Sequence, residues 1–407
     1  MQRPAVRTLL ATAALLALAC GVGVAQMNPA AQSASPPDAD CVIPSGYAAT
    51  VLVPYFVTEV DSFNLATLVT VANGTSFDTL ARVVMWTDWG VPTLAFDIYL
   101  DPFGMVQINT RDLFDGIVPS TGSTSDLSSF PFCGSLPPYH TNPVLTSDEG
   151  DQLAAWHSGL GGPLDSRCAG LDHGDGLARG YLTIDVVDEC SGVEAVDPVF
   201  TPVNTSYPYF ADGGGSGGIA IAENRLWADV AIIDNANNFA QAAKAVGIWA
   251  DPNQFTVDGT YTFYGRYSGW DTRDDRVPVP WEWSSWYLNG APFSGGGAMI
   301  VWRDTESPDA SPITCGVNPS WWPLTGLVTA QNDDSSASET LPADSFPAAT
   351  QMTSLDELNA SYNNGIIFIS GDSALPMWVQ PNLSAFGRYS ATFTAAAGRK
   401  LCGTSVP

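Results

Sequence analysis

The chain has 407 residues, of which 45% are hydrophobic and 14% charged, with 38 glycines and 30 prolines. This composition excludes disordered, collagen-like and coiled-coil proteins and is typical of a folded protein that is poor in charge. The formal net charge of -27 repels phosphate backbones and anionic lipid headgroups, so we expect neither nucleic acid nor a membrane surface as a partner.

Residues 1–25 have the features of a secretory signal peptide. Arg3 and Arg7 precede an apolar run at residues 9–19, and a small-residue stretch ends at Ala25, where cleavage is expected. The apolar run is too short to span a bilayer. No second run of membrane length follows, so we expect no transmembrane segment.

An alternative interpretation of the N-terminus involves Cys20. It follows Ala-Leu-Ala, as in a lipoprotein box, so a lipid anchor on its thiol is the second possibility. Residues 26–40 are rich in Ala, Ser, Pro and Asp and predict a flexible leader. Both interpretations predict an exported protein, located in the periplasm, on the outer-membrane surface or outside the cell.

The remaining six cysteines support export. An even number in an exported chain predicts three disulfides, and the sequence does not select their connectivity. We favour a pair between Cys168 and Cys190 around one strand, and a pair between Cys41 and Cys402 across the ends of the folded region. No Cys-x-x-Cys motif occurs, so we expect no structural zinc site and no redox dithiol. The six are Cys41, Cys133, Cys168, Cys190, Cys315 and Cys402.

Five β-prone segments follow one another between residues 41 and 125. Strict alternation in 94–100 places Leu94, Phe96, Ile98 and Leu100 on one face and Ala95, Asp97 and Tyr99 on the other. No helical pattern separates the segments, which predicts an antiparallel, immunoglobulin-like β-sandwich. The dipeptide Asn73-Gly74 favours the positive φ of a tight hairpin turn. The five segments are 49–57, 65–73, 81–86, 94–100 and 105–109.

Residues 126–407 predict a larger β-rich second region, which either stands alone or shares a sheet with the first. A helix is expected over 146–159, with Thr146 or Ser147 as N-cap and Gly159 as stop, and a second short helix from Ser354. Long loops are expected at 191–223, 268–297 and 304–362, where function or disulfides are concentrated. The predicted strands are 178–189, 224–233, 244–250, 260–267, 298–303, 365–370 and 388–395.

Signals for catalysis are weak. Residues 214–218 satisfy G-x-S-x-G, but they lie in a glycine run with no preceding strand, which indicates a flexible loop. A Ser/His/Asp hydrolase would need His140, His157 or His173 to face a nucleophile, and no local signature favours any of them. A secreted hydrolase is therefore the third alternative, after two binding roles.

Two acidic segments are candidate metal sites. His173, Asp172 and Asp175 lie in a glycine-flanked stretch that is equally explained as a turn. In the second segment, three aspartates supply the oxygen ligands that calcium prefers, while Arg273 and Arg276 offset their charge. We therefore expect no cofactor, and a bound calcium ion is the alternative. The three aspartates are Asp271, Asp274 and Asp275.

Tryptophan is abundant, with 13 in the chain. Four aromatic residues are close together in the expected loop 281–287, where exposed rings could stack on sugars and so form a carbohydrate-binding module. The alternatives are that these rings fill the core, as Trp commonly does, or that they form a protein interface. The four residues are Trp281, Trp283, Trp286 and Tyr287.

An ordered set of segments is spread over most of the mature chain, from residue 51 to residue 351: 51–100, ARGYLTIDVVDEC (178–190), NNFAQ (237–241), YTFYGRY (261–267), WYLNGAPFSGGGAMIVWRD (286–304) and FPAATQ (346–351). Together they resemble a group of secreted proteins of environmental Gram-negative bacteria that carry no assigned activity. The resemblance implies export and a single β-rich unit, and it implies no catalytic or binding residue.

These observations favour an exported, non-enzymatic surface or interaction protein of unknown ligand. A glycan or a cell-surface protein is the expected partner. Carbohydrate binding by the tryptophan-rich segment is the second hypothesis and hydrolysis is the third.

Overall fold

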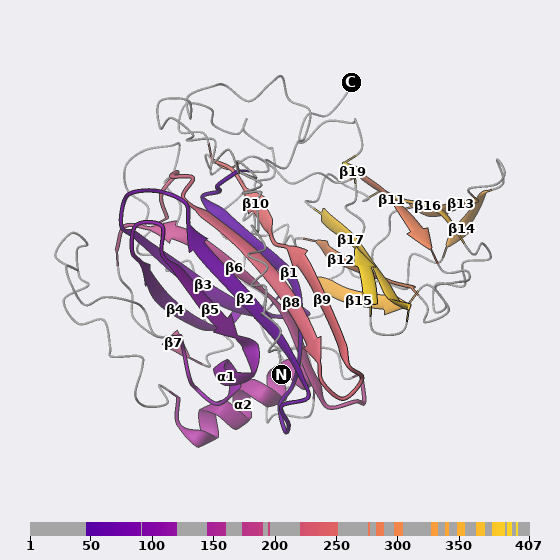
Figure 1. The fold of residues 1–407 in the computed structure, drawn as a ribbon. Coiled ribbons are helices and arrows are strands. Elements are labelled where there is room, and N and C mark those ends of the chain that lie inside the picture. The colour runs from indigo at the N-terminus through magenta and orange to yellow at the C-terminus, as the bar shows by residue number, and fades with distance from the viewer. Residues whose placement is uncertain are drawn as a thin grey trace, which may run out of the picture. The chain divides into compact units, whose positions relative to one another are not determined.

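Antiparallel β-sheets dominate the structure, a computed structural model of the chain (Figure 1). The helices of the described residues are α1 (Thr110–Phe114) and α2 (Ser147–Ser158). The mainly β, antiparallel fold class is thereby confirmed. The structure describes residues 46–90, 92–119, 145–159, 173–189, 194–195, 220–250, 276, 282–288, 297–303, 327–332, 338–341, 348–354, 364–370, 377–386, 389–392 and 396–397.

Two sheets are formed by strands that lie before residue 251. The first has six strands in the order β10-β1-β6-β3-β4-β7, and the second has four in the order β5-β2-β8-β9. Strands β6, β8 and β10 come from beyond residue 125 and pair with strands that precede it, and β9 extends the second sheet by pairing with β8. The bounds are β1 (Thr50–Glu59), β2 (Leu65–Asn73), β3 (Thr79–Thr87), β4 (Pro92–Leu100), β5 (Met105–Asn109), β6 (Leu177–Val187), β7 (Glu194–Ala195), β8 (Leu226–Asp234), β9 (Phe239–Lys244) and β10 (Val246–Ile248).

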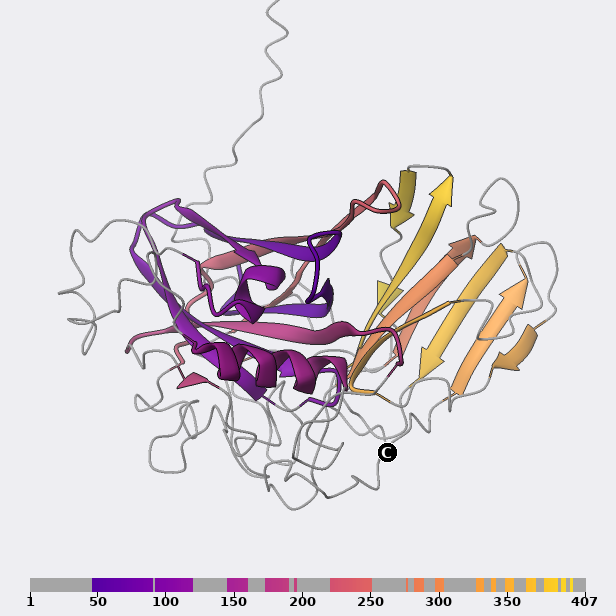
Figure 2. The same cartoon turned by 90° about the horizontal axis from the view of Figure 1, so that it is seen from below.

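One hydrophobic core lies between these two sheets, which Figure 2 shows as two layers. The even-numbered residues of β4 from Leu94 to Leu100 lie in this core, as the alternation predicts, and they are joined by Val69 of β2 and Val230 of β8. Leu113 of α1 and Leu153 of α2 belong to the same cluster. The immunoglobulin-like topology expected for 41–125 stays a prediction.

The opposite face of the six-stranded sheet is buried too, and it carries charge. In register across four strands lie Asp97, Arg82, Asp185 and Thr50, each at most 3% exposed. The Arg82 guanidinium donates to Asp97 at 3.0 Å. The Nε–H of Arg276 donates to the Thr50 hydroxyl at 2.6 Å. Because a buried charge is costly unless it is paired, opposite charges alternate along this row.

The tight hairpin predicted at Asn73-Gly74 is wrong. Strand β2 pairs with β5 and β8, whereas β3 pairs with β4 and β6, so the chain crosses between the two sheets here. Gly74 packs against the Tyr47 ring instead: a Cβ at this position would lie 1.8 Å from that ring, which would have to move aside. The Asn73 side chain donates to the Phe77 carbonyl at 2.6 Å and thereby orders the crossing loop.

Two further sheets are formed by strands after residue 281. Their orders are β14-β13-β16-β11-β19 and β15-β12-β17-β18. Much of this region was expected to be loop, and the aromatic and β-branched residues in it pair as strands instead, because such residues favour extended backbone. The bounds are β11 (Glu282–Leu288), β12 (Gly297–Arg303), β13 (Leu327–Asn332), β14 (Ser338–Leu341), β15 (Thr350–Ser354), β16 (Asn364–Ser370), β17 (Met377–Phe386), β18 (Tyr389–Thr392) and β19 (Ala396–Ala397).

Helix α2 begins and ends where its sequence predicts. Thr146 is the N-cap of a complete capping box with Glu149, and Gly159 ends the helix with a φ of 74°. The second predicted helix would start at Ser354, which is the last residue of β15, and the residues that follow lie outside the described parts. Predicted strand 260–267 also lies outside them.

Candidate functional site

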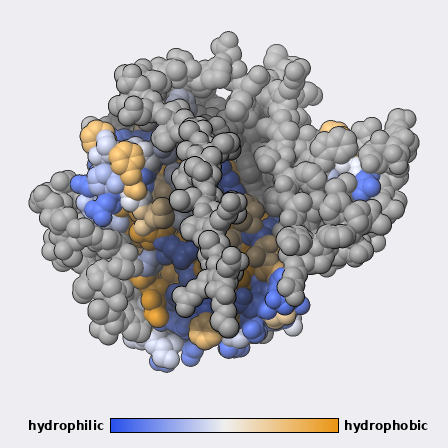
Figure 3. Space-filling view, viewed as in Figure 1, coloured by the Kyte–Doolittle hydropathy of each residue, from blue (hydrophilic) through white to orange (hydrophobic). Residues whose placement is uncertain are grey.

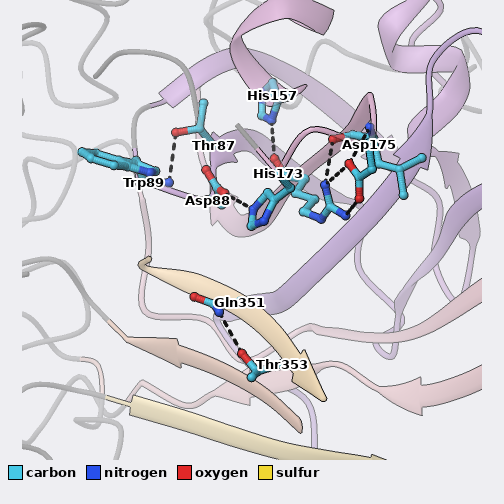
Figure 4. A network of polar contacts seen from close by, with 10 residues as sticks. Thr87, Asp88, Trp89, His157, His173, Asp175, Gln351 and Thr353 are labelled. Carbon is cyan, nitrogen blue, oxygen red and sulfur yellow. Dashed lines mark hydrogen bonds and ion pairs between the residues drawn. The ribbon is translucent and has the colours of Figure 1, made fainter. Parts of the chain in front are cut away.

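A polar cluster forms where the β3–β4 turn meets the turn that precedes β6 (Figure 4). The carboxylate of Asp88, which is 1% exposed, lies 3.3 Å from Nε2 of the part-exposed His173. The backbone carbonyl of Asp88 accepts the amides of Ala349 and Thr350, at 2.7 and 3.1 Å. Asp88 therefore ties a sheet of the N-terminal half to the chain around β15. No Ser, Thr or Cys of the described residues hydrogen-bonds His173.

The second acid of this cluster is Asp175. Both its oxygens accept from the Arg179 guanidinium, one of them at 2.8 Å, and it also accepts the Leu177 amide. The hydrogen bond from Arg179 lowers the pKa of Asp175 to about 2. Tyr55 lies beside Arg179, and burial raises its pKa to about 12. Asp175 and His173, considered as metal ligands from the sequence, thus have different partners.

His157 of α2 is buried between strands and contacts the rings of Phe56 and Phe114. Its Nδ1 lies 2.8 Å from the Arg179 carbonyl, which can only accept, so this nitrogen carries the proton. Its Nε2 lies 2.7 Å from the Thr93 hydroxyl. This pair resembles a base and a nucleophile, but both residues are at most 1% exposed. The two hydrogen bonds of His157 therefore hold α2 against β4, through Thr93, and against β6, through Arg179.

We expect His157 to make stability depend on pH. Burial lowers its pKa to about 4, below the ordinary value of 6.5, so the unfolded chain binds more protons between these limits. The unfolding free energy should therefore fall by about 3 kcal/mol as the pH is lowered through this range. Urea unfolding of the wild type and of His157→Gln between pH 7 and pH 4 measures this fall in the unfolding free energy. Equal pH dependence in both proteins would contradict the expectation.

Exposed apolar side chains gather near the C-terminal end of strand β2. Phe77 in the β2–β3 loop, Phe103 in the β4–β5 turn and Met105 at the start of β5 are 60%, 67% and 68% exposed. Figure 3 shows hydrophobic side chains standing out among hydrophilic ones where these turns meet, at the upper left. We call Phe77, Phe103 and Met105 the aromatic tip.

Hydrogen bonds make the aromatic tip a single ordered surface. The Phe103 amide donates to the Thr75 carbonyl at 3.0 Å, and the Asn73 amide donates to the Gly104 carbonyl at 2.9 Å. The Asn73 side chain bonds to both turns, donating to the carbonyls of Phe77 and Asp101. Because β-sheets support both turns, the exposed rings are presented on a rigid base.

Phe103 has a backbone conformation that does not suit it. Its φ of 57° lies in the left-handed region, which is unfavourable for a bulky side chain and where Gly or Asn is usual. Since the ring is also mostly exposed, neither packing nor local geometry explains a phenylalanine here. The tip is not among the sites predicted above, although a Phe in the turn-like contexts TSFD and DPFG indicates an exposed aromatic residue.

Most of the site residues predicted from sequence lie outside the described residues. Trp283 and Trp286 lie on strand β11 rather than in a loop. Tyr287, on the same strand, is 1% exposed, an environment unlike the open face that sugar stacking requires. Arg276, expected to pair with the nearby aspartates, reaches Thr50 in the sheet. Outside the described residues lie Trp281, Asp271, Asp274, Asp275, Cys20 and the six other cysteines.

Two findings concern metals and membranes. Within the described ranges, no three His, Cys, Asp or Glu side chains come together as metal ligands. In the same ranges, no helix has the length and apolar character needed to cross a bilayer.

Comparisons with protein-family models, with curated proteins and with solved structures gave no match to this chain. The chain is therefore classified by its fold, as a mainly β protein with antiparallel sheets.

Proposed function

We propose that the protein is exported and acts as a non-enzymatic interaction protein, binding its partner through the aromatic tip. The observation that carries the proposal is the exposure of Phe103 on a strained backbone. Strain at an exposed residue reduces stability, and such residues are found where a function requires them. Clustered exposed apolar side chains are typical of interaction sites.

Two further features support this function. Residues 1–25 have the pattern of a signal peptide and the other cysteines are even in number, which favours action outside the cytoplasm. In the polar cluster, Asp88 pairs with His173 and Asp175 pairs with Arg179. These structural contacts favour a binding role over a catalytic one. Loops on a β-scaffold are a common place for recognition.

The test replaces both rings of the tip. Phe77→Ser/Phe103→Asn removes the two exposed rings, while Asn tolerates the left-handed backbone, so we expect stability to be unchanged or raised by about 1 kcal/mol. The wild type and this variant are each cross-linked to the envelope and secreted fractions of the producing cell. Bound proteins are then identified by mass spectrometry. We expect a partner that the wild type retains and the variant loses.

Phe63→Ser is the matched control. Phe63 is 74% exposed but precedes β2, at the other end of that strand from the tip. The control should retain the partner. If the wild type, the tip variant and the control retain the same proteins, the tip is not a binding surface and the proposal fails.

A further inference from the structure

We infer that the partner of the aromatic tip is a protein surface with an apolar pocket bordered by arginine or lysine side chains. This inference rests on the proposed function and adds the chemistry of the partner. It follows from the charges that surround the exposed rings.

Three acidic residues lie beside the tip. Asp78 follows Phe77 directly, Asp101 lies in the same turn as Phe103, and the exposed Glu223 lies in the chain that leads to β8. Within the described residues, Arg225 is the positively charged side chain that lies among these acids. Three carboxylates against one guanidinium leave this border negative, in agreement with the net charge of the whole chain.

Arg225 is used within the tip. Its guanidinium lies over the Phe77 ring, 5.5 Å from the ring centre. It donates to the Asp78 carbonyl at 2.7 Å and forms an ion pair with Glu223. These contacts position the Phe77 ring, and they commit the positive charge to the protein's own groups. The charge that a partner meets is therefore mainly that of Asp78 and Asp101.

Charge complementarity excludes other occupants. A second copy of this chain would bring the same acidic border into contact with itself, which costs free energy. An anionic lipid surface is repelled for the same reason. A basic border on the partner instead attracts the tip, while the two rings and Met105 enter its apolar centre, the arrangement usual in protein interfaces.

Three synthetic peptides test the inference. They share the same leucine and tryptophan positions and carry arginine, serine or glutamate at all others. Binding is measured by fluorescence anisotropy of a label on the peptide. We expect the arginine peptide to bind at least about tenfold more tightly than the serine peptide, and the glutamate peptide most weakly. Raising the salt to about 0.5 M should weaken binding of the arginine peptide selectively.

Variants show where the peptide binds. Phe77→Ser/Phe103→Asn should weaken the arginine peptide by at least about tenfold. Asp78→Asn/Asp101→Asn should remove its advantage over the serine peptide. Asp61→Asn/Asp151→Asn, which removes one exposed acid from the β1–β2 connection and one from α2, is the matched control and should change little, because the long-range charge is the same in both double variants.

Several outcomes would overturn the inference. If the arginine peptide binds all variants equally, it contacts acidic surface elsewhere, and if it does not bind at all, the basic border is refuted. If arginine and serine peptides bind equally and both need the rings, the acidic border has no role, yet the proposed function stands. Failure of the proposed function itself is seen separately, in the cross-linking comparison.

Discussion

Replacing Arg82 with methionine should destabilise the protein by about 3 to 5 kcal/mol, because it removes the buried cation that pairs with the carboxylate of Asp97. Arg82 lies between Asp97 and Asp185 in the register of three neighbouring strands. Asp97 is fully buried and Arg82 is 3% exposed, so water cannot replace the lost partner. Methionine keeps most of the volume of the side chain, and the loss is therefore one of charge rather than of packing.

Urea unfolding at neutral pH measures this loss, with the slope against urea as a check on two-state behaviour. The double variant Arg82→Met/Asp97→Asn should recover part of the stability, because the buried negative charge that Arg82 balanced is removed as well. Asp115→Asn, in an ion pair whose carboxylate is 44% exposed, should cost less than about 1 kcal/mol. A single variant Arg82→Met as stable as the wild type would show that the charges of this row do not depend on one another.

Alanine at Gly180 should cost about 4 kcal/mol, above the usual penalty for overpacking. A Cβ at this position would lie 2.0 Å from the Trp86 carbonyl oxygen and 2.9 Å from the Phe56 ring. The ring can turn away, but the carbonyl belongs to the neighbouring strand β3, so the two strands must separate. The local backbone is not the cause, since the φ of Gly180 is not in the left-handed region.

Two other glycines separate the effects of space and conformation. Gly46→Ala meets no atom within 4 Å and should leave stability unchanged. Gly176→Ala has equal space but a φ of 71°, and should cost about 1 to 2 kcal/mol. The three variants are compared by thermal and urea unfolding. A Gly180→Ala protein that loses no more than Gly176→Ala would mean that β3 and β6 adjust without cost.

Local patterns in the sequence predicted most of the strands before residue 251 and all of helix α2. The capping box of Thr146 and Glu149 and the left-handed Gly159 involve only neighbouring residues, so they can be read without the fold. Strands β2 and β5 have the predicted bounds, because alternation and turn residues are local signals too. Strand β11 was missed because glycine- and proline-rich flanks hid a short aromatic strand.

The mainly β class, the position of α2 and the face of β4 that enters the core can all be predicted from the residues alone, since each depends on residues within one strand or helix. The placement of β2 and β3 in different sheets, the pairing of Arg82 with Asp97 and the approach of the turns that carry Phe77 and Phe103 become visible only in the folded chain. The physical reason is the same in each case. Pairing and exposure depend on which distant strands become neighbours, and that choice is made by the packing of the whole chain rather than by any local pattern.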